Sequence, residues 1–280
     1  MKNETLIPIC LIAILAVSLV LFYRRESSLR GQTLQTDEQT NEHQKGAYEE
    51  KKLINNPAPG QKVTIGEVVE NTNGEKVAKA ETHDDASGKD KVVKQKSSLD
   101  QQYYFVAASL PDKVTAANKL AEMHRRAQYL LQAIDEDLDN NGRIIADDNV
   151  DITDNMRALL KKHYNKKVTF GEYYNPHDKT VGSNAEKGIV LEVCLRSKYN
   201  PNEWNTDNTL FRVYTHELAH SADHDFRGDG DEAHGPDFRR IHNYLLKLSA
   251  VLGIYSCREY AESKQSFCGL QLTERDDFCM

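Results

Sequence analysis

His216-Glu217-Leu218-Ala219-His220 decides how this chain folds, and a second histidine-containing segment, His234-Gly235-Pro236-Asp237-Phe238, follows it. Residues four apart on a helix lie one turn apart on the same face, so a helix places His216 and His220 side by side. Two such imidazoles can bind one metal ion, and the glutamate beside the first can reach a water molecule on that metal. The stretch therefore predicts a helix that carries a metal site.

A catalytic zinc site needs three protein ligands and keeps a fourth position for water. The candidates for the third ligand are Asp223, His224, His234 and His242. Ligands at His216, His220 and His224 on one straight helix would span about 11–12 Å, far more than bonds of about 2 Å allow. Asp223 points past the metal for a similar reason, and His242 falls inside the next predicted helix. His234 lies at a loop-to-helix junction, where the chain can return over the metal, and is our predicted third ligand.

Glu217 is the predicted general base, which takes a proton from the metal-bound water and passes it to the leaving amine. Tyr244 and Tyr255 are both candidates for holding the developing oxyanion, and the sequence does not choose between them. A chance match on a surface helix is the alternative reading of the motif. The apolar neighbours Val213 and Leu218 argue against it, because buried histidine and glutamate are costly unless they are coordinated or hydrogen-bonded.

The periodicity of the segment from residue 101 onward predicts an α+β domain in which the active-site helix packs beside a short sheet. Helices are expected over residues 111–135 and 154–163, from Asp207 or Asn208 through the motif, and from Pro236 to Gly253. Strands are expected over residues 168–174 and 188–196. The second strand alternates as a half-buried strand does and is a candidate for pairing with an extended substrate. Residues 175–187 read as a loop and residues 254–280 as an irregular extension.

The segment from Asn208 to Gly253 resembles the SprT-like and WLM groups of small zincin metalloproteases, which carry His-Glu-x-x-His and then a His-Gly-x-x-Phe turn that opens a helix. A wider resemblance, over residues 115–280, is to WLM-like metallopeptidases encoded by large DNA viruses. It is carried by Cys194-Leu195-Arg196, Asn208-Thr209-Leu210, Thr215 through His220, Gly253-Ile254-Tyr255 and Phe267-Cys268-Gly269-Leu270. The resemblance implies zinc on His216, His220 and His234 with Glu217 catalytic. The loop after His220 departs from this pattern, because it is longer and more acidic.

The whole chain divides into three parts. Residues 6–23 are free of charge and long enough, at about 1.5 Å per residue, to cross about 27 Å of hydrocarbon, so residues 1–23 are expected to be a single-pass membrane anchor. Residues 24–100 are polar and predict a disordered linker. Residues 101–280 form the predicted zincin-like domain. Arg24, Arg25 and Arg30 outnumber the positive groups before the span, which predicts a cytoplasmic domain.

Charge and cysteine content narrow the possible partners. Residues 101–280 hold 22 Lys and Arg against 28 Asp and Glu, so nucleic acid is not expected as a partner. A protein or peptide substrate and the bilayer at residues 6–23 are the partners expected. The cysteines at positions 10, 194, 257, 268 and 279 are odd in number and include no Cys-x-x-Cys pair. This pattern disfavours a disulfide framework and predicts reduced thiols.

Residues 137–148 form a second candidate ion site. Asp137, Asp139 and Asn141 fall at positions one, three and five of a calcium-binding EF-hand loop, and Asp148 falls at the twelfth position, where a glutamate is usual. A plain Asp, Asn and Gly turn explains the same residues. The sequence thus predicts a membrane-anchored zinc metallopeptidase; the alternative is a catalytically idle, metal-stabilised binding or tethering module with calcium sensing at 137–148.

Overall fold

The computed structural model describes residues 57–59, 61–70, 76–81, 89–164, 168–185, 188–223, 234–257, 266–268 and 270–271. The predicted anchor at residues 6–23 and the acidic loop at residues 224–233 lie outside these ranges. Within them, no helix has both the length and the apolar character needed to cross a bilayer.

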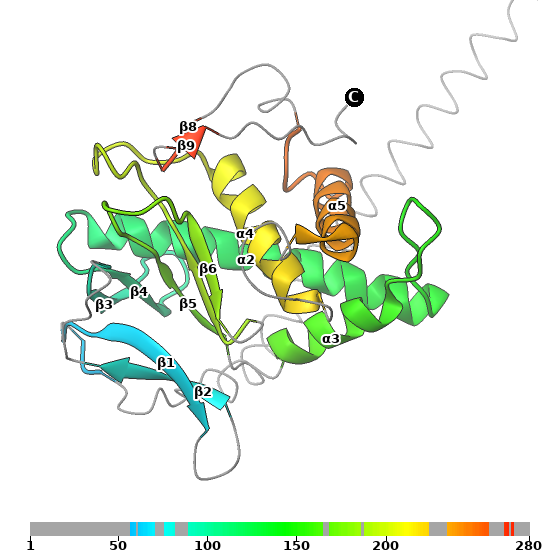
Figure 1. Ribbon diagram of the computed structural model, residues 1–280, viewed down its shortest axis with the longest axis horizontal. Coiled ribbons are helices and arrows are strands. Elements are labelled where there is room, and N and C mark those ends of the chain that lie inside the picture. The colour runs from blue at the N-terminus through cyan, green and yellow to red at the C-terminus, as the bar shows by residue number, and fades with distance from the viewer. Residues whose placement is uncertain are drawn as a thin grey trace, which may run out of the picture. The chain divides into compact units, whose positions relative to one another are not determined.

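A five-stranded mixed sheet lies at the centre of the described residues (Figure 1). Its order is β3 (Val92–Lys96), β4 (Tyr103–Ala107), β5 (Thr169–Glu172), β7 (Val190–Val193) and β6 (Gly182–Ala185). The inner pairs β4–β5 and β5–β7 are parallel, whereas the outer pairs β3–β4 and β6–β7 are antiparallel. β6, which precedes β7 in the chain, therefore forms the edge of the sheet next to β7.

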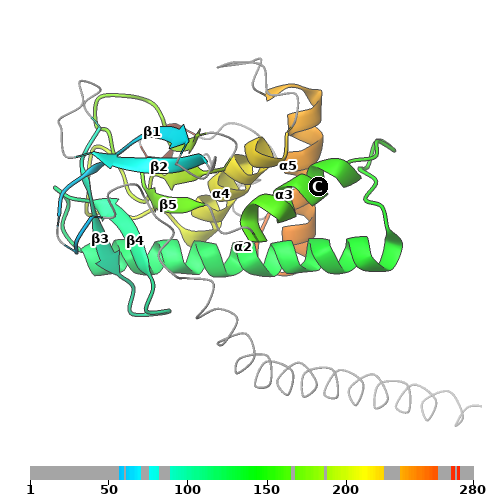
Figure 2. The same cartoon turned by 90° about the horizontal axis from the view of Figure 1, so that it is seen from below.

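The two faces of the sheet are covered by different elements. The long helix α2 (Lys113–Asn141) packs on one face, and the hairpin of β1 (Thr64–Glu70) and β2 (Lys76–Glu81) lies on the other (Figure 2). Val63, Ile65 and Val92 form a small apolar cluster with Phe105 and Val190 on the hairpin side. The predicted disordered linker up to residue 100 is therefore wrong for β1, β2 and β3: β3 belongs to the central sheet, and these few apolar residues pack the β1–β2 hairpin against it.

The remaining helices match the periodicity of the sequence. They are α3 (Thr153–Tyr164), α4 (Asp207–Ala222) and α5 (Pro236–Val251), and with α2 they confirm an α+β domain. The N-cap of α4 is Thr206, whose side chain accepts a hydrogen bond from Thr209 N, one residue before the predicted caps. The predicted C-terminal extension contains the two-residue strands β8 (Ser266–Phe267) and β9 (Leu270–Gln271).

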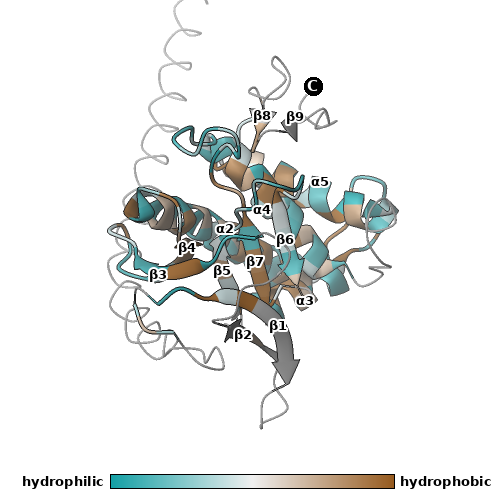
Figure 3. Ribbon diagram, turned by 60° about the vertical axis from the view of Figure 1, so that its left-hand side comes forward, coloured by the Kyte–Doolittle hydropathy of each residue, from teal (hydrophilic) through white to brown (hydrophobic). Residues whose placement is uncertain are grey.

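β7 is buried along its whole length, which corrects the predicted half-buried strand. Leu191 and Val193 face the main core, and Val190 packs on the hairpin side. Figure 3 shows the hydrophobic residues along β7. A parallel strand in a sheet covered on both faces has no solvated side, so its alternation does not indicate exposure.

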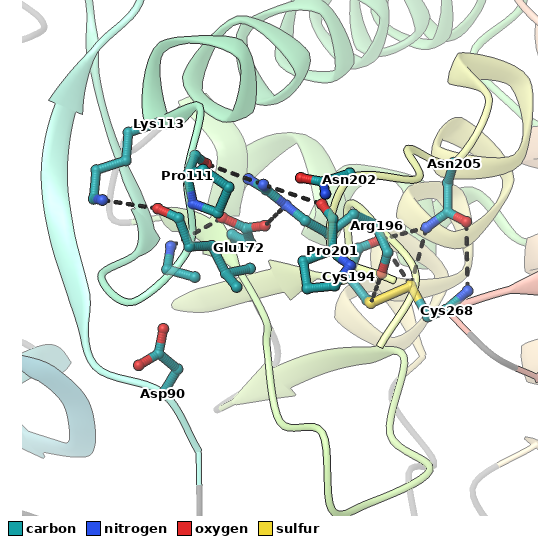
Figure 4. Close-up of polar contacts among 12 residues, drawn as sticks. Asp90, Pro111, Lys113, Glu172, Cys194, Arg196, Pro201, Asn202, Asn205 and Cys268 are labelled. Atoms are coloured by element: carbon teal, nitrogen blue, oxygen red, sulfur yellow. Dashed lines mark hydrogen bonds and ion pairs between the residues drawn. A yellow bond between two sulfur atoms is a disulfide. The ribbon is translucent and has the colours of Figure 1, made fainter. Parts of the chain in front are cut away.

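A buried ion pair ties the end of β5 to the segment after β7 (Figure 4). Arg196 Nε donates to Glu172 Oε1 at 2.9 Å, and each side chain is 1% exposed. Glu172 also accepts from Ala107 N, and Arg196 donates to the carbonyl oxygen of Pro111. The guanidinium lies 3.8 Å from the ring centre of Trp204. Because both charges have hydrogen-bond partners, the cost of their desolvation is offset, and loss of either one would leave the other buried and unpaired.

A disulfide joins Cys194 to Cys268, across 74 residues of sequence, and Cys257 is also disulfide-bonded. Asn205 Nδ2 donates to Cys268 Sγ at 3.0 Å. The predicted reduced thiols are therefore wrong. The cross-link holds the β8–β9 segment against the end of β7 (Figure 4).

Replacing both Cys194 and Cys268 with serine should lower the free energy of unfolding by about 4 kcal/mol, because the cross-link restricts a long loop in the unfolded chain. Chemical denaturation of the full chain, with and without reductant, measures this loss. A non-reduced peptide map in which the Cys194 peptide is not linked to the Cys268 peptide would contradict the assignment.

Two histidines away from the motif should make stability depend on pH. Burial lowers the pKa of His124 to about 4 and the pKa of His163 to about 3. Between pH 6.5 and 4 the unfolded chain therefore binds protons that the folded chain does not, so stability falls as pH falls, by up to about 1.4 kcal/mol per pH unit for each group. In urea titrations across this window, H124Q and H163Q should each flatten the slope relative to the wild type; wild-type slopes in both variants would contradict this prediction.

Candidate metal centre

α4 places the two motif histidines one turn apart on the same face, as the spacing predicts. The Nε2 atoms of His216 and His220 are 3.2 Å apart. Two nitrogen atoms at this distance, on neighbouring turns of a buried helix, can act as ligands of one ion.

His234 completes the set. It lies directly before α5, where Gly235 is the N-cap and Pro236 takes the first helical turn. Its Nε2 atom is 3.1 Å from His216 Nε2, and the ligand atoms of the three histidines all lie within 4.8 Å of one another. Across the described ranges, this is the one group of three or more potential ligands that could hold a metal ion. The predicted ligand set is thus brought together.

The rejected candidates lie elsewhere. Asp223 is the C-cap residue of α4 and is not in the converging group. His224 lies outside the described residues. His242 is buried on α5, with its ring centre 5.3 Å from that of His216. It is not in the converging group.

Phe238 is the residue of the site whose role the sequence did not reveal. Its ring centre lies 4.8 Å from His216, 4.3 Å from His220 and 4.8 Å from His234, and the side chain is buried. It lies on α5 one turn after His234, so the turn that supplies the third ligand also supplies an apolar wall for all three. The signal in the sequence that could have identified this role is the position of Phe238, four residues after His234.

Burial keeps the histidines in the form that binds metal. Desolvation, followed by the neighbouring histidines, holds the pKa of His216 well below its usual value, and burial lowers the pKa of His220 to about 4. Metal binding requires the neutral imidazole, so these two rings need to release no proton at neutral pH.

Glu217 directly follows His216 on α4 and is buried, at 6% exposure. Burial raises the pKa of its carboxyl group to about 8. A cation bound nearby would favour the carboxylate and act against this shift. The group is therefore suited to exchange a proton near neutral pH.

Of the two tyrosines proposed for the oxyanion, Tyr255 lies away from this centre. It lines a pocket of about 410 Å³ with Thr206, Asp207 and Asn208, at the start of α4. Burial, followed by the charge of Asp137, raises the pKa of Tyr244. The assignment of Tyr244 to the oxyanion stays a prediction.

The predicted calcium loop does not form. Asp137, Asp139 and Asn141 lie in the last turns of α2, where Asn141 Nδ2 donates to Asp137 Oδ1. Asp148 is paired with Arg240 of α5. An EF-hand loop needs these oxygen atoms to converge outside the helix, so calcium has no support here.

The strand that could receive a substrate is also corrected. Residues 188–196 contain β7, which is paired on one side with β5 and on the other with β6. Its main-chain groups are already used. β6, which the sequence placed in a loop, pairs with β7 alone within the described part of the chain and packs against α4.

Comparisons with known proteins give limited similarity. No family model matches the chain. The uncharacterized protein R325 of Acanthamoeba polyphaga mimivirus is 26% identical over 180 residues, which are 64% of this chain and 81% of that protein. Crystal structures of Wss1 from Saccharomyces cerevisiae and of a Wss1 mutant have TM-scores of 0.36 and 0.35 and identities of 19% and 17%; each covers 53% of this chain, and 87% and 88% of the Wss1 chains is covered. These values are too low to assign a function, so the proposal below rests on the site.

Replacing His234 with alanine should remove stoichiometric zinc from the purified full chain, because two ligands on one helix remain and do not enclose the ion. Metal analysis after dialysis measures zinc per chain. H242A is the matched control and should retain zinc, since His242 is not among the three converging residues. Loss of zinc in H242A together with retention in H234A would contradict the assigned ligands.

Proposed function

We propose that the chain is a zinc metallopeptidase that hydrolyses peptide bonds, with His216, His220 and His234 as ligands and Glu217 as the general base. The observation that carries the proposal is the convergence of two imidazoles from α4 with one from the turn before α5, on a helix that also carries a buried glutamate. Structural zinc sites close the coordination sphere with four protein ligands, whereas catalytic sites use three. Three ligands are what the described residues supply here.

The separations of the ligands fit zinc. Zinc–nitrogen bonds of 2.0–2.1 Å in a tetrahedron put two ligand nitrogens about 3.3 Å apart. The two Nε2 separations from His216 are 3.1 and 3.2 Å, close to that value. Three imidazole nitrogens beside the apolar ring of Phe238 suit a borderline-soft cation better than calcium or magnesium, which prefer oxygen ligands.

Zinc in such a site supplies an activated water and polarises the scissile carbonyl. Within the chain itself, Glu217 performs the proton transfer. Its carboxylate accepts a proton from the attacking water and returns it to the nitrogen of the leaving amine. The burial of Glu217 makes the carboxylate a stronger base than an exposed glutamate, because desolvation disfavours its charged form.

We propose that an extended segment of the substrate pairs with β6. An edge strand offers unpaired N–H and C=O groups, and pairing with them recognises a main chain of any sequence. β6 contacts α4, which carries Glu217, so a peptide on this edge lies next to the base. The partner class is therefore an unfolded or locally extended protein.

Attachment to a bilayer through residues 6–23 is a further part of the proposal and rests on the sequence alone. The cytoplasmic position predicted from Arg24, Arg25 and Arg30 is also a proposal. The Cys194–Cys268 disulfide argues against it, because thiols in the cytosol are kept reduced.

Cleavage of a denatured protein by the zinc-loaded full chain tests the proposed activity. E217Q should keep its zinc and lose about 10²–10⁴-fold in kcat, because the amide cannot accept the proton. E203Q alters an exposed glutamate outside the site and should cleave as the wild type does. Bound zinc with no cleavage by the wild type would reject the peptidase and favour the metal-stabilised binding module.

A further inference from the structure

α4 presents two neighbouring faces to two different elements. His216 and His220 face the turn that holds His234 and the ring of Phe238. Glu217 and Ser221 follow one residue later in each turn, so their side chains are rotated by about 100° from the ligands. This second face meets the hairpin of β6 and β7.

Gly182 of β6 lies directly against the carboxyl group of Glu217. A Cβ atom at position 182 would be 2.4 Å from Glu217 Oε1 and 3.1 Å from Glu217 Cδ. Side chains do not approach so closely, so any residue other than glycine would displace the carboxyl group. Position 182 thus sets where the base can lie.

Asn184, two residues along the same strand, holds the main chain of α4 at the same point. Its Nδ2 donates to the carbonyl oxygen of Glu217 and, at 3.0 Å, to Ser221 Oγ. Gly188, in the turn that follows β6, has a φ of +100°, and a Cβ there would be 2.5 Å from Ser221 Oγ. The hairpin therefore contacts the 217–221 face of the helix through two glycines and one asparagine.

The same two residues of β6 direct main-chain groups to the edge of the strand that faces away from β7. Cys194 N donates to Val181 O, and the antiparallel register pairs Gly182 with Val193 and Asn184 with Leu191. In such a ladder hydrogen-bonded and non-hydrogen-bonded pairs alternate, so the N–H and C=O groups of Gly182 and Asn184 point away from β7. Their side-chain positions point toward α4, because residues two apart share a face.

We propose that Gly182 and Asn184 are positioning residues that set the place of the Glu217 carboxyl group relative to a peptide bound on the β6 edge. The inference rests on the proposed peptidase function for its kinetic consequence, but the contact itself does not. If β6 shifts as a unit, the edge that binds the peptide and the Glu217 carboxyl group move together. If the carboxyl group alone shifts, its distance from the bound peptide changes.

Gly182→Ala tests this arrangement. The full-length variant should bind zinc as the wild type does and lose about 10²-fold in kcat with little change in KM, because a displacement of about 1 Å of a reacting group has an effect of this size. N184A should show the same pattern through loss of the two donated hydrogen bonds, and it serves if G182A does not fold. S183A is the matched control on the same strand, with its side chain on the opposite face, and should retain kcat.

A crystal structure of G182A separates this inference from the proposed function. Displacement of the Glu217 carboxyl group with the three histidines unmoved supports the positioning role, whether or not the wild type cleaves peptides. An unmoved carboxyl group overturns the role. Equal losses of kcat in G182A, N184A and S183A would also overturn it, because they would indicate a general disturbance of β6.

Discussion

The geometry of the site depends on the angle between successive side chains of a buried helix. Neighbouring positions on α4 are about 100° apart, so His216 and Glu217 cannot face the same element. α4 is therefore packed between two supports. The start of α5 contacts the histidines, and the β6–β7 hairpin contacts the glutamate. If either support moved, the position of the Glu217 carboxyl group relative to the three histidines would change.

Burial gives this arrangement its chemistry. It keeps His216 and His220 neutral and holds back the ionisation of Glu217, so these three side chains contribute little charge of their own. A divalent cation would then become the dominant charge at the centre. The Glu172–Arg196 pair ties the end of β5 to the segment that leads from β7 toward α4. The grouping of the histidines and the position of Glu217 are thus consequences of the same packing.

The helices that carry the site can be predicted well from the sequence, whereas the strands beside them cannot. The i, i+4 spacing of His216 and His220 and the proline after His234 are local signals, so α4, α5 and the grouping of the three histidines could be predicted. β6 is defined by its pairing with β7, a non-local contact, and its Gly and Asn content resembles a loop. The same holds for β1, β2 and β3, whose polar composition conceals a small apolar cluster. The pairing of Cys194 with Cys268 has no local signature at all.

That disulfide has a consequence for the biogenesis of the protein. Formation of one sulfur–sulfur bond removes two electrons from the chain, and an acceptor must take them while the end of β7 and the β8–β9 segment are held together. A ribosomal product in a glutathione-buffered cytosol meets no such acceptor by default. Maturation therefore calls for a dedicated thiol oxidase or for export, and the chain reaches its final form only where one of these is at hand.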